Sequence, residues 1–261
     1  MRVLLTLAYD GTLYCGWQYQ DNGPTVQAAL ESALMSIFGV HIPTIAASRT
    51  DSGVHAAGQR VAFSVSECKI PPEKLCYVIN KRLPRDIVTQ KSERVNDGFN
   101  PRFAAKEKTY IYRIYNARYP NPLYMRYSWH VPYPLNREAM ARACEYFVGR
   151  HDFSAFCASG GSAITFERTV ISCSIKEIQR DESLVSRCKT QGTHPPVLWE
   201  LSINGDGFLY NMVRIITGTI IDVGRGRLRA EDIPAIIASR DRSTAGPTAP
   251  AHGLCLYRVG F

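Results

Sequence analysis

The chain alternates between stretches whose apolar residues recur at every second position and stretches whose apolar residues recur at helical spacing. Residues 2–9 are apolar and β-prone, and they predict a first strand. The next pattern predicts an amphipathic helix that begins after the N-cap Thr25 and ends at Gly39. Its apolar residues recur every three or four positions: Val26, Ala29, Leu30, Ala33, Leu34, Ile37 and Phe38. Such a helix packs its apolar face against a sheet.

The same rules predict the other elements of the chain. Strands are predicted at residues 42–47, 60–65, 109–115, 170–179, 197–204 and 255–259. Helices are predicted from Pro71 to about Leu83, from the N-cap Asn136 to Gly149, from about Asn211 to Gly224, and around residues 233–237. The polar segment 187–196 predicts a surface loop.

The arrangement of these elements predicts two domains. The charged and small residues of segment 104–108 indicate a connection between a domain at 1–104 and a domain at 105–261. Strands and helices alternate along the chain, but the strands on either side of Asp51 are typical of a hairpin, which argues against a purely parallel sheet. We therefore predict an α+β fold with two domains that meet at a cleft.

Composition narrows the class of protein. The chain has 261 residues, of which 45% are hydrophobic, and a net charge of +8 with an isoelectric point of about 9.1. This basic excess suits a polyanionic partner, and it suits an ordinary basic protein equally well. The 8 cysteines show neither a C-x-x-C pair nor Cys/His zinc spacing, so we expect reduced thiols and no metal. No apolar run approaches the roughly 20 residues of a membrane span, so we expect a soluble, cytoplasmic protein.

Segment 48–59 concentrates more reactive side chains than any other stretch. It reads S-R-T-D-S-G-V-H-A-A-G-Q and lies between two predicted strands. Asp51 on such a loop can be aimed into a cleft, and Arg49 can keep the carboxylate ionised or contact an anion. The alternative is an ordinary turn, in which Asp51 bonds to its own backbone and Gly53 supplies a positive φ.

This segment resembles the signature of the TruA-type tRNA pseudouridine synthases, which reads roughly G-R-T-D-A-G-V-H-x-x-G-Q. Ser48 and Ser52 stand where that family usually has Gly and Ala, and both are small replacements. The resemblance places the nucleophilic aspartate of the family at Asp51.

Other stretches resemble the same family, in the same order along the chain. They correspond to its patterns N-x-x-L-P-x-D-I at residues 80–87, F-x-A-R-F at 99–103, K/R-x-Y-x-Y at 108–112, H/N-D-F-x-x-F at 151–156, R-x-V/I at 168–170, F-L-x-x-M-V-R at 208–214 and A-G-P-T-A-P-A-x-G-L at 245–254. Asn100 and Pro101 depart from the usual pair before the arginine of the second pattern. The resemblance therefore covers essentially the whole chain.

The resemblance implies a fold and a reaction. It implies two ferredoxin- or RRM-like halves with mixed, mainly antiparallel sheets that flank a basic cleft, and a homodimer that holds tRNA. The implied activity is that of a tRNA pseudouridine synthase, which isomerises uridine in the anticodon arm at uridines 38 to 40. The target base has to be flipped out before it can react. The isomerisation needs no redox cofactor, nucleotide or metal, and no membrane is involved.

The resemblance also assigns roles to individual residues. Asp51 is the nucleophile, or a base that stabilises an intermediate, and Tyr110 lies against the uracil, where it can assist removal of the C5 proton. Arg214 stands in an apolar helix and therefore needs a partner, which is Asp51 or, as a plain structural alternative, Asp206 or Asp222.

The RNA contacts implied by the resemblance come from several segments. Arg49 fills the space of the flipped base or holds the displaced backbone, Leu254 lines the pocket, and the phosphate contacts come from basic residues: Lys69, Arg102 and Arg118. Phe103 offers stacking to RNA, although core packing explains such a phenylalanine equally simply. The resemblance leaves the RNA contacts of the loop at 158–167 open.

Two other classes of function remain open at this point. One is a non-catalytic RNA-binding module with the same fold. The other is a glycosidase or nucleosidase that uses Asp51 on a small substrate, a reading that calls for a second carboxylate near the first.

Overall fold

The computed structural model describes the whole chain except residues 67, 162 and 181–195. It divides into two units: unit 1 comprises Met1–Lys108 and Cys255–Phe261, and unit 2 comprises Thr109–Leu254. Our predicted domain at 105–261 included the last strand, whereas unit 1 contains it. The reason is a long-range pairing: β10 (Leu254–Gly260) runs parallel to β3 (His55–Ser64). Most of the predicted loop at 187–196 lies outside the described residues.

The sheet of unit 1 is built around the first strand, β1 (Arg2–Tyr9), as its apolar pattern predicts. The order of strands is β4-β1-β3-β10, with β2 (Ile45–Ala46) paired to β3 and β4 spanning Ile87–Val95. β1 is antiparallel to both β3 and β4. The prediction did not include β4, because few of its residues are apolar and buried. Its inward positions include Thr89 and Ser92, which are buried but polar.

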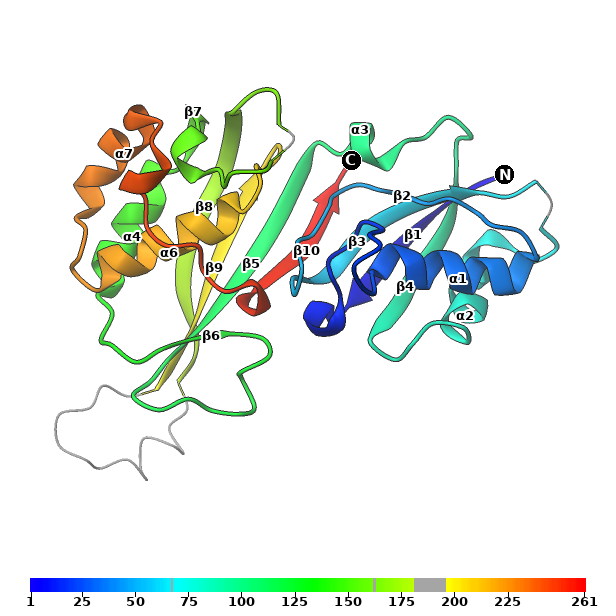
Figure 1. Cartoon of the computed structure of the whole chain (residues 1–261), viewed down its shortest axis with the longest axis horizontal. Coiled ribbons are helices and arrows are strands. Elements are labelled where there is room, and N and C mark those ends of the chain that lie inside the picture. The colour runs from blue at the N-terminus through cyan, green and yellow to red at the C-terminus, as the bar shows by residue number, and fades with distance from the viewer. Residues whose placement is uncertain (67, 162, 181–195) are drawn as a thin grey trace. The chain divides into compact units, whose positions relative to one another are not determined.

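The helices of unit 1 pack on this sheet (Figure 1). α1 (Val26–Phe38) has the predicted bounds, with the Thr25 hydroxyl accepting a hydrogen bond at its start and Gly39 in a left-handed conformation at its end. α2 (Leu75–Asn80) is shorter than predicted, because residues 72–74 form a 3-10 turn before it. A further short helix, α3 (Pro101–Ala104), was not predicted.

Unit 2 contains strands with helices packed against them (Figure 1). Its strands lie in the order β5 (Glu107–Asn116), β9 (Val197–Gly205), β8 (Glu167–Arg180) and β7 (Gly149–Asp152), and β6 (Trp129–Val131) pairs with β5. Its helices are α4 (Arg137–Tyr146), α6 (Met212–Gly224) and α7 (Ile233–Ser239). Mixed helix and strand content with mainly antiparallel pairing confirms the predicted α+β class.

Helix α6 forms the centre of unit 2. Most of its residues are buried, as the apolar pattern on several of its sides predicts. Its buried threonines donate hydrogen bonds to carbonyl groups one turn earlier: Thr217 to Val213 and Thr219 to Ile215. The helix thus buries polar side chains without leaving their hydroxyl groups unpaired.

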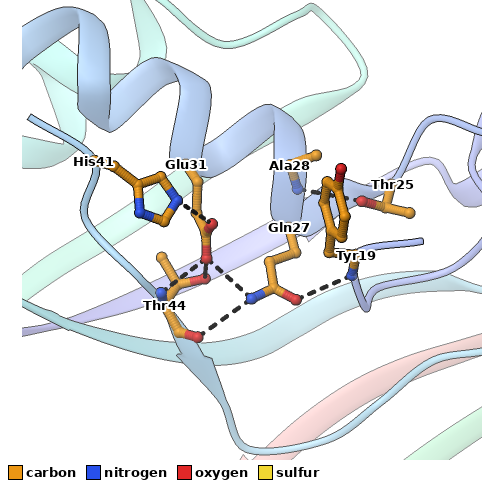
Figure 2. A network of polar contacts seen from close by, with 7 residues as sticks. All are labelled: Tyr19, Thr25, Gln27, Ala28, Glu31, His41 and Thr44. Atoms are coloured by element: carbon orange, nitrogen blue, oxygen red, sulfur yellow. Dashed lines mark hydrogen bonds and ion pairs between the residues drawn. The ribbon is translucent and has the colours of Figure 1, made fainter. Parts of the chain in front are cut away.

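A polar network ties α1 to the chain on both sides of it (Figure 2). One carboxylate oxygen of Glu31 accepts hydrogen bonds from the Thr44 N–H at 2.9 Å, the Thr44 hydroxyl at 2.8 Å and the Gln27 amide at 2.9 Å. The other oxygen contacts His41 at 3.0 Å. Gln27 in turn accepts a hydrogen bond from the Tyr19 N–H at 3.1 Å. The network therefore fixes residues 19 and 44 relative to one helix.

The network favours the ionised form of Glu31. Burial opposes ionisation and would raise the pKa of Glu31, but the hydrogen bonds from Gln27, Thr44 and His41 outweigh it. The pKa of Glu31 consequently lies below its ordinary value of 4.5. A carboxylate with a depressed pKa stabilises the fold above its unfolded-state pKa, and that contribution is lost as the pH falls through the folded-state pKa.

We expect Glu31→Gln to lower the free energy of unfolding by about 1–3 kcal/mol at pH 7, because a neutral amide is a weaker acceptor. The difference from the unmodified chain should begin to shrink as the pH falls below 4.5 and disappear below the lower folded-state pKa, where Glu31 in the folded protein is protonated as well. Urea denaturation at a series of pH values measures this. Glu145→Gln, an exposed position on α4, is the control and should change stability by less than about 0.5 kcal/mol. An equal effect of Glu31→Gln at every pH would contradict the prediction.

Candidate active site

Asp51 lies in unit 1, on the loop that joins β2 to β3. The Val54 N–H donates to the Asp51 carbonyl at 3.1 Å, and Gly53 has a φ of 75°, so residues 51–54 form a tight turn. The alternative interpretation of this segment as a turn is therefore right for the backbone. The turn is compatible with a chemical role for Asp51, because the Asp51 side chain is only half-buried and the neighbouring Arg49 is exposed.

Residues 9–17, which we call the bracing segment, hold the Asp51 loop from one side. The Trp17 N–H donates to the Thr50 carbonyl at 3.0 Å, and the Tyr9 hydroxyl shares a 2.7 Å hydrogen bond with the Thr50 hydroxyl. On the other side of Asp51, the Gly53 N–H donates to the Tyr14 carbonyl at 3.2 Å. The loop is thus fastened both before and after the carboxylate.

Two glycines allow the bracing segment to approach the loop closely. A Cβ on Gly11 would lie 2.0 Å from the Val54 carbonyl oxygen, and a Cβ on Gly16 would lie 2.6 Å from the Thr50 carbonyl oxygen. Gly16 also has a φ of 96°, a conformation that side chains disfavour. Any other residue at either position would push the bracing segment off the loop.

His55 fastens the start of β3 to the same segment. Its Nδ1 lies 3.0 Å from the Gly11 nitrogen and 3.1 Å from a carboxylate oxygen of Asp10. An unprotonated Nδ1 accepts from the Gly11 N–H, and a protonated Nδ1 donates to Asp10. Either form binds this buried histidine to the bracing segment, so its role in the sequence motif is to hold the loop.

Gln59 ends the motif and holds the other end of the loop. Its side-chain amide donates to the Ser48 carbonyl at 2.7 Å, and its carbonyl oxygen accepts from the Arg60 N–H at 3.1 Å. Gln59 is fully buried and lies within β3, which begins at His55 rather than at the predicted residue 60. The motif is therefore half loop and half strand.

Tyr110 lies in unit 2, on β5, and is buried. Its ring meets the ring of Phe208 edge to face, with centroids 5.3 Å apart. Leu254, at the end of the unit, is also buried. Phe208 opens the predicted motif at 208–214, so the structure brings Tyr110 beside that motif within one unit. An edge-to-face pair fixes the plane of the tyrosine ring.

Arg214 is half-buried in the first turn of α6. Its Nε donates to the Ala249 carbonyl at 2.7 Å, and one terminal nitrogen donates to the Asn211 side chain at 2.7 Å. The Ala249 N–H donates back to the Arg214 carbonyl at 3.1 Å. Asn211 is the residue directly before α6, and it has a φ of 60°. These bonds orient the guanidinium group of Arg214 from two directions.

The carboxylates offered as structural partners of Arg214 bind elsewhere. Asp206 accepts a hydrogen bond from the Thr169 N–H at 3.0 Å. Asp222 lies 3.9 Å from Arg225 and 3.7 Å from Arg227. Both of these aspartates are therefore engaged with groups other than Arg214.

The segment before Leu254 is held against α6 and β5. The Tyr112 hydroxyl donates to the Pro250 carbonyl at 2.7 Å, and burial raises the pKa of Tyr112 so that the phenol keeps its proton. The Gly246 N–H donates to the Thr219 hydroxyl at 2.9 Å. Sequence reasoning did not identify Tyr112 or Asn211 as supports of Arg214, although both lie within motifs that it did identify.

The residues predicted to contact RNA are exposed, with one exception. The exposed ones are Arg49, Lys69, Arg102, Phe103 and Arg118. Phe103 is 81% exposed, which excludes the core-packing alternative for this residue, and the Arg118 guanidinium lies over the Tyr119 ring at 5.3 Å. The exception is the buried Leu254. Exposed cations and an exposed ring suit contacts with a nucleic acid, and those contacts remain a prediction.

Within the described part of the chain, no group of three or more His, Cys, Asp or Glu side chains is placed to hold a metal ion. The helices described there also include none with the length and apolar character needed to cross a membrane.

Known proteins resemble this chain over nearly its full length. A family model described as tRNA pseudouridine synthase matches residues 6–104 and 143–261. The tRNA pseudouridine synthase A of Acetivibrio thermocellus is 46% identical over 259 residues, which is 99% of each protein. The proteins of the same name from Moorella thermoacetica and Bacillus licheniformis are 45% and 43% identical, over at least 98% of each sequence. A solved Cbf5–Nop10–Gar1 complex aligns at 12% identity and a TM-score of 0.36, over 84% of this chain and 45% of that chain, a similarity too low to bear on fold or function.

We expect Gly11→Ala to lower the free energy of unfolding by about 1–3 kcal/mol, because the added Cβ collides with the Val54 carbonyl and not with a flexible side chain. Chemical denaturation measures this loss. Gly98→Ala is the matched control, since nothing lies within 4 Å of a Cβ there, and it should stay within about 0.5 kcal/mol. Equal stability of the two variants would show that Gly11 does not limit the approach of the two segments.

Proposed function

The chain belongs to the tRNA pseudouridine synthase family, and from this premise we propose that it isomerises uridine to pseudouridine in the anticodon arm of tRNA, at uridines 38 to 40. The observation that carries the proposal is the Asp51 loop. The motif that suggested a reactive aspartate folds into a turn fastened on both sides, by Trp17 and by Tyr14. Identity of 46% over 99% of a relative named tRNA pseudouridine synthase A supports the same type of reaction on tRNA.

The reaction defines which bonds and protons the site has to act on. The N1–C1′ bond of uridine breaks, the uracil turns, and C5 bonds to C1′ while the C5 proton leaves and N1 gains one. No atoms are lost or gained overall. Asp51 supplies the carboxylate that acts on the sugar carbon or on the base. A stacked uridine is inaccessible, so the base is flipped out of the stack. The exposed Arg49, on the same loop as Asp51, occupies the space that the base leaves.

Tyr110 and Arg214 complete the proposed catalytic set. Tyr110 packs on the uracil, and its edge-to-face contact with Phe208 keeps the ring in one orientation. Arg214 holds Asp51 ionised, as predicted from the sequence, and its bonds to Ala249 and Asn211 leave the guanidinium group little freedom to turn. The pairing of Arg214 with Asp51 joins residues of different units and stays a prediction.

Binding of tRNA is proposed to use the exposed cations. Lys69, Arg102 and Arg118 contact phosphates, which gives affinity without reading sequence. Phe103 stacks on RNA, and Leu254 lines the pocket for the base. We propose a homodimer acting in the cytoplasm, as the family resemblance implies.

We expect the purified protein to release tritium from unmodified tRNA whose uridines carry tritium at C5, because formation of the C5–C1′ bond expels that hydrogen. Free labelled uridine should release none, since affinity depends on phosphate contacts. Mapping the product should place pseudouridine at positions 38 to 40. Binding of tRNA without release would favour the RNA-binding module, and turnover of free uridine would favour the nucleosidase.

We expect Arg214→Lys to reduce the turnover number roughly 100-fold. The planar guanidinium group can bond to Ala249, Asn211 and Asp51 at once, whereas a lysine ammonium lacks this geometry. Tritium release under saturating tRNA measures this. Arg227→Lys is the matched control in the same unit, since Arg227 is exposed and pairs only loosely with Asp222 at 3.7 Å. Similar turnover for the two variants would remove Arg214 from the proposed site.

A further inference from the structure

We propose that Tyr14 and Asp86 are positioning residues for Asp51, acting as a two-residue brace between the sheet of unit 1 and the turn that carries the carboxylate. The inference rests on the proposed function for its catalytic consequence. Neither residue belongs to the set assigned to the reaction. Both lie in unit 1, and they are 72 residues apart in the sequence.

The backbone of Tyr14 contacts the turn directly. Its carbonyl oxygen accepts hydrogen bonds from the Gly53 N–H at 3.2 Å and from the Ser52 hydroxyl at 3.3 Å. Ser52 and Gly53 directly follow Asp51. A displacement of the Tyr14 carbonyl therefore moves the turn that carries the Asp51 carboxylate.

The side chain of Tyr14 is buried and hydrogen-bonded to Asp86. The residue is 8% exposed, and its hydroxyl donates to a carboxylate oxygen of Asp86 at 2.8 Å. Burial, together with the negative charges of Asp86 and Asp10, raises the pKa of Tyr14 above its ordinary value. The phenol thus keeps its proton and remains a donor to a charged acceptor, which makes a stronger hydrogen bond than a neutral pair.

Asp86 is itself anchored to the sheet. Asp86 lies within a turn in which the Ile87 N–H donates to the Pro84 carbonyl at 3.1 Å, and the Asp86 carbonyl accepts from the Asp10 N–H at 2.9 Å. The next residue, Ile87, is buried, begins β4 and lies opposite Tyr9 of β1. Asp86 is therefore fixed to the edge of the paired strands at the point where the bracing segment leaves them.

These contacts form one continuous route. The paired strands β4 and β1 fix Asp86, Asp86 fixes the ring of Tyr14, and the carbonyl of Tyr14 fixes the turn after Asp51. Backbone hydrogen bonds hold residues 11–15 at Tyr14, whose carbonyl accepts from the Gly53 N–H, and at Cys15, whose N–H donates to the Pro24 carbonyl. The Tyr14–Asp86 bond adds a side-chain support directly behind the turn.

The test compares Tyr14→Phe, Asp86→Ala, Asp86→Asn and the double variant Tyr14→Phe/Asp86→Ala. Hydrogen exchange of a peptide covering residues 48–55 reports the turn directly and does not depend on activity. Tritium release from tRNA reports the turnover number and KM. Ser92→Ala is the matched control: it removes a 2.9 Å hydrogen bond from the Cys76 N–H in the same unit, between α2 and β4.

We expect Tyr14→Phe and Asp86→Ala each to speed exchange in residues 48–55 at least tenfold and to lower the turnover number 10- to 100-fold, with KM for tRNA within twofold. Asp86→Asn should keep most of the activity, because an amide oxygen still accepts from the phenol. The double variant should be no worse than either single variant, since both remove the same bond. Ser92→Ala should change neither exchange in this peptide nor turnover.

Unchanged exchange in residues 48–55, additive losses in the double variant, or an equal loss in Ser92→Ala would overturn the proposal. An unmodified protein that releases no tritium, together with faster exchange in the variants, would refute the proposed function and leave the brace standing as a support of the turn. Failure of the brace and failure of the function are thus seen in different measurements.

Discussion

The structure of unit 1 depends on how closely the bracing segment approaches the Asp51 loop. Main-chain groups meet main-chain groups there, so the spacing is set by atoms that cannot adjust as a side chain does. Gly11 lies against the Val54 carbonyl and Gly16 against the Thr50 carbonyl. A carboxylate that reacts has to be held in one place, and loops alone do not provide this. Here the loop is held by a neighbouring segment that is itself continuous with strand β1.

In unit 2, a different set of contacts holds the side chain of Arg214 in place. The guanidinium group is held by a carbonyl of segment 245–254 and by the side chain of Asn211. That segment is held by Thr219 of α6 and by Tyr112 of β5. In both units a side chain of the proposed site is supported by irregular chain, and that chain is supported by regular structure.

The sequence predicted the regular elements best where apolar residues repeat over several turns, as in α1, or over a whole strand, as in β1. It missed β4, whose buried positions Thr89 and Ser92 are polar, and it missed short strands such as β6 and β7. It also assigned the last strand to the C-terminal domain, because the pairing of β10 with β3 joins residues about 200 positions apart and leaves no local pattern.

The sequence points to residues of the proposed site only where a motif marks them. Asp51, Tyr110 and Arg214 lie in motifs with recognisable spacing, whereas the link from Tyr14 to Asp86 spans 72 residues. The central claim, that Asp51 performs the chemistry, is tested most directly by Asp51→Asn, which keeps the size of the side chain and removes its charge. Tritium release in a single turnover should fall below detection while tRNA binding stays within about threefold. Release within tenfold of the unmodified protein would contradict the account.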